Sequence, residues 1–166
     1  MTVAIWAAFG ARSILQAVTG DRARSVAAAA LGFAQRALDE AISRSKQREQ
    51  FGQPIARFQQ IGAHLADSFA ELEAARLLVY RAATNAGRGF PSMYESAMAK
   101  CFANEMVRDV AGTAMQLMGG YGYSKQFDME RRLRDAWGWG IAGGTIDVQK
   151  TNIAAALVGR RFDQRR

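Results

Sequence analysis

Proline is almost absent from this chain, and that scarcity limits its fold more than any other feature. The 166 residues contain two prolines, Pro54 and Pro91, and each lies within a few residues of a glycine. The long stretches between them are rich in Ala, Leu, Arg, Gln and Glu, which favour helices. With 49% hydrophobic and 22% charged residues, the composition excludes an intrinsically disordered chain. The sequence therefore predicts an all-α protein.

Five helices are expected from apolar periodicity and end signals. The first begins after Asp21, a candidate N-cap, and runs to about Gln50. The second spans about 57–86. The third follows Pro91 and runs to 118, with Ser92 as its cap. A short helix is expected around 129–139, and the last one starts at the N-cap Thr145. The three long helices and a shorter final one predict an up-down four-helix bundle.

The third predicted helix carries apolar residues at strict four-residue spacing: Met98, Phe102, Met106, Val110, Ala114 and Met118. Four residues overshoot a helical turn by about 40°, so the apolar series drifts around the helix. We therefore expect its buried face to contact neighbours on both sides. The methionines in and near this series are Met98, Met106, Met115 and Met118. They either pack against another subunit or fill the core of the chain itself.

Charge and rare residues exclude several kinds of site. The 22 basic and 15 acidic residues give a net charge of +7, but the arginines are scattered. Nucleic-acid binding would need a basic stripe with interleaved aromatics, and it remains a remote alternative. Because Cys101 and His64 are unique, they support neither an internal disulfide nor a multi-histidine metal site. With no apolar run of eighteen residues, we expect a cytoplasmic protein that is not inserted in a membrane.

The candidate functional residues lie where the predicted helices end. Glycine pairs at 119–120 and 143–144 would let a ligand approach the backbone closely, although glycine is also a common C-cap. Arg48, three residues before the pair Phe51-Gly52, could bind a phosphate through forked hydrogen bonds, or could be an ordinary surface charge. The positive end of the helix that starts at Thr145 favours an anion or an electron-rich ring edge.

These motifs, in their order and spacing, resemble the C-terminal helical domain of the acyl-CoA dehydrogenases from about Ser13 onward. The matching segments are Arg48–Ile55 with Phe58-Gln59, then 72–78 (Leu-Glu-Ala-Ala-Arg-Leu-Leu), 97–100 (Ala-Met-Ala-Lys), 116–123 (Gln-x-x-Gly-Gly-x-Gly-Tyr), 130–136 (Glu-Arg-x-x-Arg-Asp-Ala) and Gly144-Thr145. The resemblance implies FAD bound across a subunit interface, and dehydrogenation of an acyl-CoA thioester between its α and β carbons.

The resemblance also implies roles for single residues. Arg48 and Phe51 would contact the FAD of a neighbouring subunit, and Gln59 would lie close to it. Gln116 and Gly120 would line the adenosine-pyrophosphate part of the cofactor. Thr145 would face the FAD from the last helix, and Arg24 would lie near the CoA side.

The sequence departs from the family pattern at the position of the catalytic base. The usual glutamate immediately before the Gly-Thr pair is replaced by Gly143, which cannot abstract a proton. Some family members carry the glutamate on the first helix instead, where Asp21 is the one acid within reach. An N-cap role also accounts for Asp21. Two further departures are Asp147, where a neutral polar residue is usual, and the glycine- and aromatic-rich stretch 137–140, which would reshape the acyl pocket.

The family also has two further domains before this one. Residues 1–18 are therefore expected to be a lead-in from the boundary of a middle domain, and 19–166 the helical bundle. Three interpretations remain open: a piece of a larger dehydrogenase, a subunit that works with a partner dehydrogenase chain, or a non-catalytic helical oligomerisation module. A homo-oligomer or a mixed complex is expected in each case.

Overall fold

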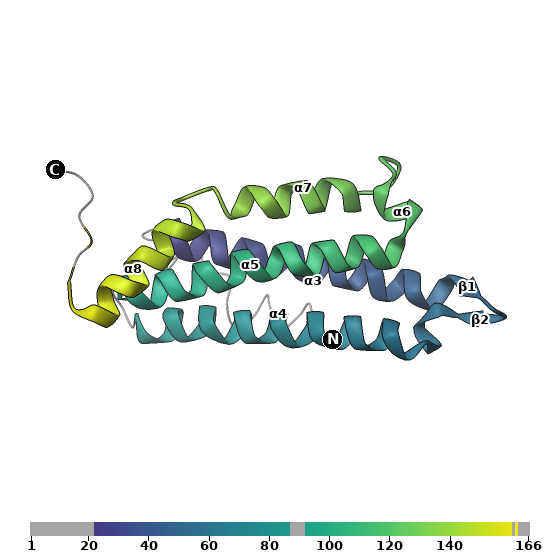
Figure 1. Ribbon diagram of the computed structural model, residues 1–166, viewed down its shortest axis with the longest axis horizontal. Helices are drawn as coiled ribbons and strands as arrows, with labels where there is room; N and C mark the ends of the chain where they lie inside the picture. Colours follow the sequence, from purple (N-terminus) through teal and green to yellow (C-terminus); the bar gives the residue numbers. More distant parts are fainter. Residues whose placement is uncertain (1–21, 87–91, 161, 163–166) are drawn as a thin grey trace.

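Four helices lie side by side in up-down order in the computed structural model (Figure 1). The model describes residues 22–86, 92–160 and 162, with side chains from Val26 onward. The bundle consists of α3 (Arg22–Gln47), α4 (Gln59–Asn85), α5 (Met93–Met118) and α7 (Met129–Trp139). The remaining elements are β1 (Glu49–Gln50), β2 (Gln53–Pro54), the 3₁₀-helix η1 (Ile55–Arg57), α6 (Gly120–Tyr123) and α8 (Ile146–Val158). The predicted all-α bundle is confirmed.

The central helix of the bundle is α5, which packs against α3, α4, α7 and α8. As predicted from the drifting apolar series, its buried residues are not confined to one stripe. Met106, Val110 and Ala114 are buried, whereas Phe102 is partly exposed. Met115 and Met118 pack against a buried cluster, so these methionines contribute to the chain's own core.

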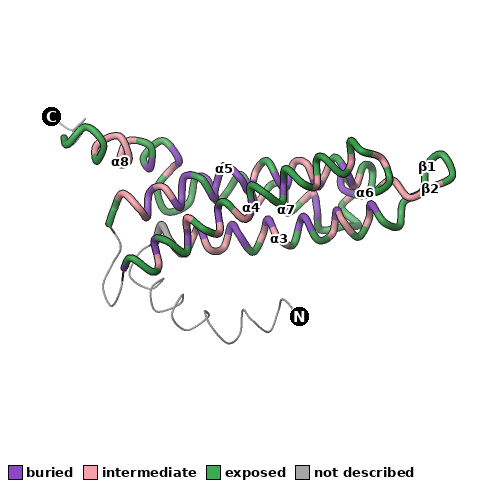
Figure 2. The backbone as a smooth tube through the Cα atoms, turned by 90° about the horizontal axis from the view of Figure 1, so that it is seen from below, coloured by how far each residue is buried: buried purple, intermediate pink, exposed green. Residues whose placement is uncertain are grey.

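Small side chains dominate the core around α3 and α5. Ala30 and Ala34 of α3 are fully buried in the same cluster as Ala99 and Ala103 of α5. The alanine-rich stretch of the first helix therefore packs against a helix that is also rich in buried alanine. Larger side chains, including Leu31 and Leu72, fill the same cluster. Figure 2 marks the buried residues at intervals along α3, α4 and α5, between exposed ones.

Local end signals set several helix bounds as predicted. The Ser92 hydroxyl accepts a hydrogen bond from the Glu95 amide at 3.2 Å, and the Thr145 hydroxyl accepts one from the Val148 amide at 3.4 Å. Both are N-cap bonds. Gly119, with a φ of 59°, ends α5 in a conformation that suits glycine.

Two features differ from the sequence prediction. The first helix ends at Gln47 rather than near Gln50, because a short antiparallel hairpin, β1–β2, occupies the connection to α4. The fourth place in the bundle belongs to α7 rather than to the last helix. Instead, α8 packs against α5 at the end of the bundle away from the hairpin (Figure 1). The predicted lead-in, 1–18, and Asp21 lie outside the described residues.

Candidate functional site

The β1–β2 hairpin presents Phe51 to solvent in an unusual backbone conformation. Its two central residues, Phe51 and Gly52, have φ values of 54° and 75°, which is the arrangement of a type I′ turn. A non-glycine residue in the left-handed region costs about 1–2 kcal/mol. The Phe51 side chain is 92% exposed, so little packing within the chain offsets this cost. Strain of this kind is typical of functional positions.

Arg48 and Gln59 flank the hairpin. The backbone of Arg48 is fixed: its amide donates to the Arg44 carbonyl and its carbonyl accepts from the Ile55 amide, each at 2.8 Å. Its side chain is exposed, as is that of Gln59 at the start of α4. Between them, the Phe51 ring meets the edge of Phe58, with centroids 6.1 Å apart. The hairpin extends beyond the end of the bundle (Figure 2), and the exposed side chains of Phe51 at its tip and Arg48 at its base are not covered by the bundle.

Gln116 and Gly120 lie at the same end of the bundle as the hairpin (Figure 1). Both are exposed, and Gln116 lines a shallow pocket of about 230 Å³ together with His64 and Thr113. The turn beyond them needs glycine, since a Cβ on Gly122 would lie 2.8 Å from the Met115 carbonyl oxygen. The structure thus brings the predicted residues Arg48, Phe51, Gln59, Gln116 and Gly120 to one end.

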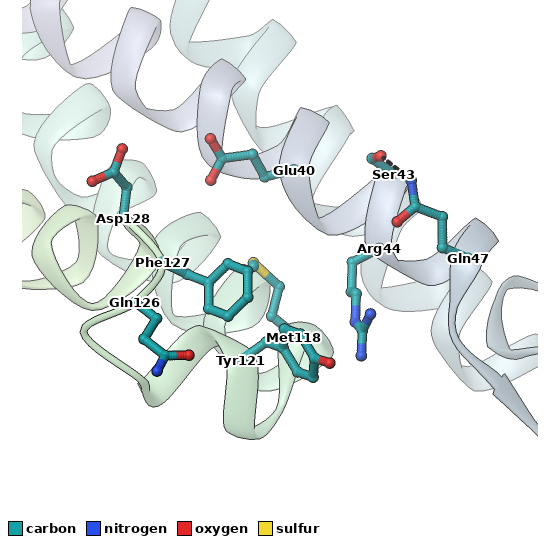
Figure 3. A pocket seen from close by; sticks show the side chains of 9 residues that line it. All are labelled: Glu40, Ser43, Arg44, Gln47, Met118, Tyr121, Gln126, Phe127 and Asp128. Atoms are coloured by element: carbon teal, nitrogen blue, oxygen red, sulfur yellow. Dashed lines mark hydrogen bonds between the residues drawn. The ribbon is translucent and has the colours of Figure 1, made fainter.

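A second pocket at this end was missed by the sequence argument. It has a volume of about 550 Å³ and is lined by Glu40, Ser43, Arg44, Gln47, Met118, Tyr121, Gln126, Phe127 and Asp128 (Figure 3). The Arg44 guanidinium lies 3.8 Å from the centre of the Tyr121 ring, a cation–π contact. The one available signal was the three- and four-residue spacing of Glu40, Ser43, Arg44 and Gln47 on the first helix, a pattern also typical of any solvated helix face.

Thr145 lies at the opposite end of α5, beside Gly143 and Gly144. These glycines have φ values of 66° and 96°, so the turn before α8 is left-handed at both. A glutamate at position 143 would be strained there. Thr145 caps α8 and lines a pocket of about 310 Å³ that also includes Arg108, Asp147 and Lys150. At this end the structure describes the backbone of Arg24, in α3, but not its side chain.

Lys100 is a further functional candidate, to which the sequence pattern assigned no role. It lies in α5 with no exposed surface, and its ammonium donates to the backbone carbonyls of Ala142 (2.7 Å) and Gly144. Burial lowers the pKa of Lys100. A lysine between Ala99 and Cys101 in an apolar helix was the available signal, because lysine is almost never fully buried without bonding partners.

The predicted site residues therefore form two groups at opposite ends of the bundle. Lys100, which contacts the Thr145 turn, lies sixteen residues before Gln116 in α5. At the ordinary helical rise, this spacing corresponds to about 24 Å. Within the part of the chain that the structure describes, no helix has the length and apolar character to cross a membrane.

Comparison with known proteins matches this arrangement to one family. The family model described as the C-terminal domain of acyl-CoA dehydrogenase matches residues 9–158. A 3-sulfinopropanoyl-CoA desulfinase of Paraburkholderia xenovorans (strain LB400) is 46% identical over 140 residues, covering 84% of this chain and 36% of that protein. A probable acyl-CoA dehydrogenase, fadE25, of Mycobacterium leprae (strain TN) is 45% identical over 135 residues, covering 81% and 35%.

Solved structures agree with the sequence matches. The butyryl-CoA dehydrogenase of Megasphaera elsdenii superposes with a TM-score of 0.80 at 41% identity, covering 88% of this chain and 38% of that one. A glutaryl-coenzyme A dehydrogenase complexed with glutaryl-CoA gives a TM-score of 0.80 at 39% identity, covering 87% and 37%. The chain thus spans little more than a third of the length of these relatives.

Proposed function

Since the chain belongs to the acyl-CoA dehydrogenase family, we propose that it contributes FAD contacts and an oligomer interface to the α,β-dehydrogenation of an acyl-CoA thioester. The observation that carries this proposal is the hairpin tip. Phe51 is held in a strained backbone conformation, 92% exposed, beside the exposed Arg48. Neither side chain packs into the chain's own core, whereas a ligand with flat rings and phosphates could stack on Phe51 and bind to Arg48.

The residues at the hairpin end suit the chemistry of FAD. A guanidinium such as that of Arg48 binds phosphate oxygens by forked, charge-assisted hydrogen bonds. The exposed ring of Phe51 offers a stacking surface, and the exposed amides of Gln59 and Gln116 offer donors and acceptors. Gly120, which has no side chain, leaves its backbone open to close approach. These five residues would hold the adenosine-pyrophosphate part of the FAD of a neighbouring subunit.

The Thr145 turn suits the other end of a cofactor. Thr145 caps α8, so the free backbone amides of the first helical turn lie next to its hydroxyl. A separation of about 24 Å along α5 means that the two groups cannot contact the same part of one cofactor. We assign them to two cofactors in an oligomer, because the family resemblance implies that Arg48 and Phe51 contact the FAD of a neighbouring subunit. The partner is a second copy of this chain or another acyl-CoA dehydrogenase chain, and residues 19–166 form the bundle domain of the assembly.

Bound FAD would accept the hydride that leaves the β-carbon of the thioester. The reaction also needs a base that removes the α-proton. Gly143, which occupies the usual position of that base, cannot do so. Asp21, which directly precedes Arg22 in the sequence, is the candidate base, and Arg24 is the candidate contact to CoA. Cytoplasmic localisation is part of the same proposal.

A second candidate function follows from Gly143. A relative 46% identical to this chain is named as a 3-sulfinopropanoyl-CoA desulfinase, and loss of the base fits a reaction on a CoA thioester that does not begin with α-proton removal. Exchange of the α-proton of an acyl-CoA for solvent deuterium separates the two. Exchange that Asp21→Asn abolishes supports dehydrogenation. Absence of exchange in a flavin-loaded complex supports the second function.

The first test is the visible absorbance of the purified chain before and after incubation with FAD and desalting. We expect a retained flavin spectrum that Arg48→Ala weakens. Arg57→Ala removes an exposed arginine from η1 and should leave the spectrum intact. A colourless wild-type chain that still forms an oligomer contradicts flavin binding and favours the oligomerisation module.

A further inference from the structure

Three side chains of α5, spaced one turn apart, donate to backbone carbonyls in the last turn of α7 and in the connection from α7 to α8. The Arg108 guanidinium donates to the Trp137 carbonyl (3.4 Å), and the Asn104 amide to the Trp139 carbonyl (3.0 Å). The Lys100 ammonium donates to the carbonyls of Ala142 and Gly144. Spacing of four residues places all three side chains on one face of α5. The bonds of Arg108 and Asn104 supply partners for carbonyls in the last turn of α7, where backbone carbonyls lack a partner within their own helix.

Of these three side chains, Lys100 is the one whose presence the stability of the fold explains least. It has no exposed surface, and none of the described carboxylates forms an ion pair with it. A buried charge is costly unless hydrogen bonds compensate it, and here the compensation comes from backbone carbonyls. Burial also lowers the pKa of the ammonium group. A methionine or leucine would fill the same space without that cost.

The two carbonyls bound by Lys100 flank the most adaptable part of the connection. Gly143 lies between them, and Gly143 and Gly144 both have positive φ values. Glycine gains the most conformational freedom when it is released from such a turn. Thr145 follows directly and begins α8, so the direction of its hydroxyl and of the first free amides of α8 depends on this turn. Lys100 therefore fixes backbone that the local sequence leaves free.

We propose that Lys100 is a positioning residue for the Thr145 turn, where the proposed function places one end of a bound FAD. Its bonds to Ala142 and Gly144 hold the Gly143-Gly144-Thr145 turn in the one conformation that presents Thr145 and the α8 amides to the cofactor. This inference rests on the proposed function for its ligand, while the positioning itself can be measured without FAD. Lys100 acts through the turn and touches no reacting atom.

Hydrogen–deuterium exchange of the full chain tests the positioning directly. In Lys100→Met we expect the amides of residues 142–149 to exchange about tenfold faster or more, with those of α4 unchanged, under conditions where both proteins are folded. Lys150→Met is the matched control, since it removes a lysine that ties α8 to Glu105 of α5 at 2.6 Å. It should leave residues 142–145 protected. Unchanged protection in Lys100→Met, or a uniform loss over all helices, overturns the proposal.

The visible spectrum of bound FAD gives the second readout. Lys100→Met should shift the flavin bands while the dissociation constant stays within about threefold of wild type, because Arg48 and Gln116 bind at the other end of the bundle. Arg48→Ala should raise the dissociation constant for FAD and leave the flavin bands of the bound cofactor unshifted. If Lys100→Met does not fold, Lys100→Gln, which keeps one amide donor, takes its place in both measurements. A wild-type chain without flavin would contradict the proposed function but would leave the exchange result decisive.

Discussion

Arg132 of α7 binds both carboxylate oxygens of Glu40 of α3, through Nη2 at 2.9 Å and Nε at 3.3 Å. The two residues are 92 positions apart in the sequence, and their pair joins α7 to α3. Both side chains are largely buried, since Arg132 is 15% exposed and Glu40 is 22% exposed. Two parallel hydrogen bonds of this kind fix orientation as well as distance. Glu40 also lines the pocket of Figure 3, so the pair holds one wall of that pocket.

Arg132→Met should lower the free energy of unfolding by about 1–3 kcal/mol, because Glu40 keeps its partner Arg36 but loses the bidentate one. Urea unfolding measures the change. Arg134→Met is the control: its pair with Glu130 is 3.1 Å long, but Arg134 is 65% exposed, and we expect a change below about 1 kcal/mol. Equal effects of the two substitutions would contradict the assigned role of the Glu40–Arg132 pair.

Phe51→Asn should separate stability from cofactor binding. Asn followed by Gly52 suits a type I′ turn, so the free energy of unfolding should stay unchanged or rise by up to about 1 kcal/mol. Affinity for FAD should fall, because the exposed ring is lost. Thermal unfolding and flavin titration measure the two effects. A clear loss of stability would mean that Phe51 serves the fold through Phe58 instead.

Gly122→Ala should destabilise the turn after α5. The new Cβ would lie 2.8 Å from the Met115 carbonyl oxygen, which is backbone and cannot turn aside. We expect a loss of about 1–3 kcal/mol in the free energy of unfolding, together with weaker FAD binding because Gly120 shifts. Gly62→Ala is the matched control, since its Cβ would meet nothing within 4 Å in α4, and alanine there should stabilise by about 0.5–1 kcal/mol. Chemical denaturation compares both variants, and a neutral Gly122→Ala would contradict the close contact.

Glu71 predicts a pH dependence. Glu71 lies on the exposed side of α4, and partial desolvation there, followed by the nearby charges of Asp109 and Asp67, raises the pKa of Glu71 above its usual value. The folded state therefore binds the proton more readily than the unfolded state, so this group favours folding at acidic pH and loses that contribution as pH rises through its folded pKa. Glu71→Gln should raise the melting temperature at pH 7 and have little effect near pH 3.

Glu49→Gln removes the same formal charge from the exposed hairpin and serves as the control. Melting curves at both pH values compare the two variants. A larger gain in melting temperature for Glu71→Gln at pH 3 than at pH 7 would contradict the predicted direction of the pH dependence.

Local sequence patterns were enough to predict the helices and most of their ends. The bounds of α7, the Ser92 and Thr145 caps and the end of α5 at Gly119 all depend on groups a few residues apart, so local patterns were enough to predict them. The hairpin was missed because Phe51 takes a positive φ that a sequence pattern would assign to glycine or asparagine. The motifs around the hairpin nevertheless identified its exposed residues.

Which side chains share an end of the bundle, and which of them find partners, depends on how the helices pack together. In the sequence, Lys100 is one charge in an apolar helix. Its two carbonyl partners belong to the α7–α8 connection, more than forty residues later, and meet it only in the folded chain. Arg132 and Glu40 likewise meet only when α7 packs against α3. Helix periodicity and caps are local interactions, encoded within one or two turns of chain. Contacts between distant residues depend on how whole helices pack, and local patterns carry no record of that packing.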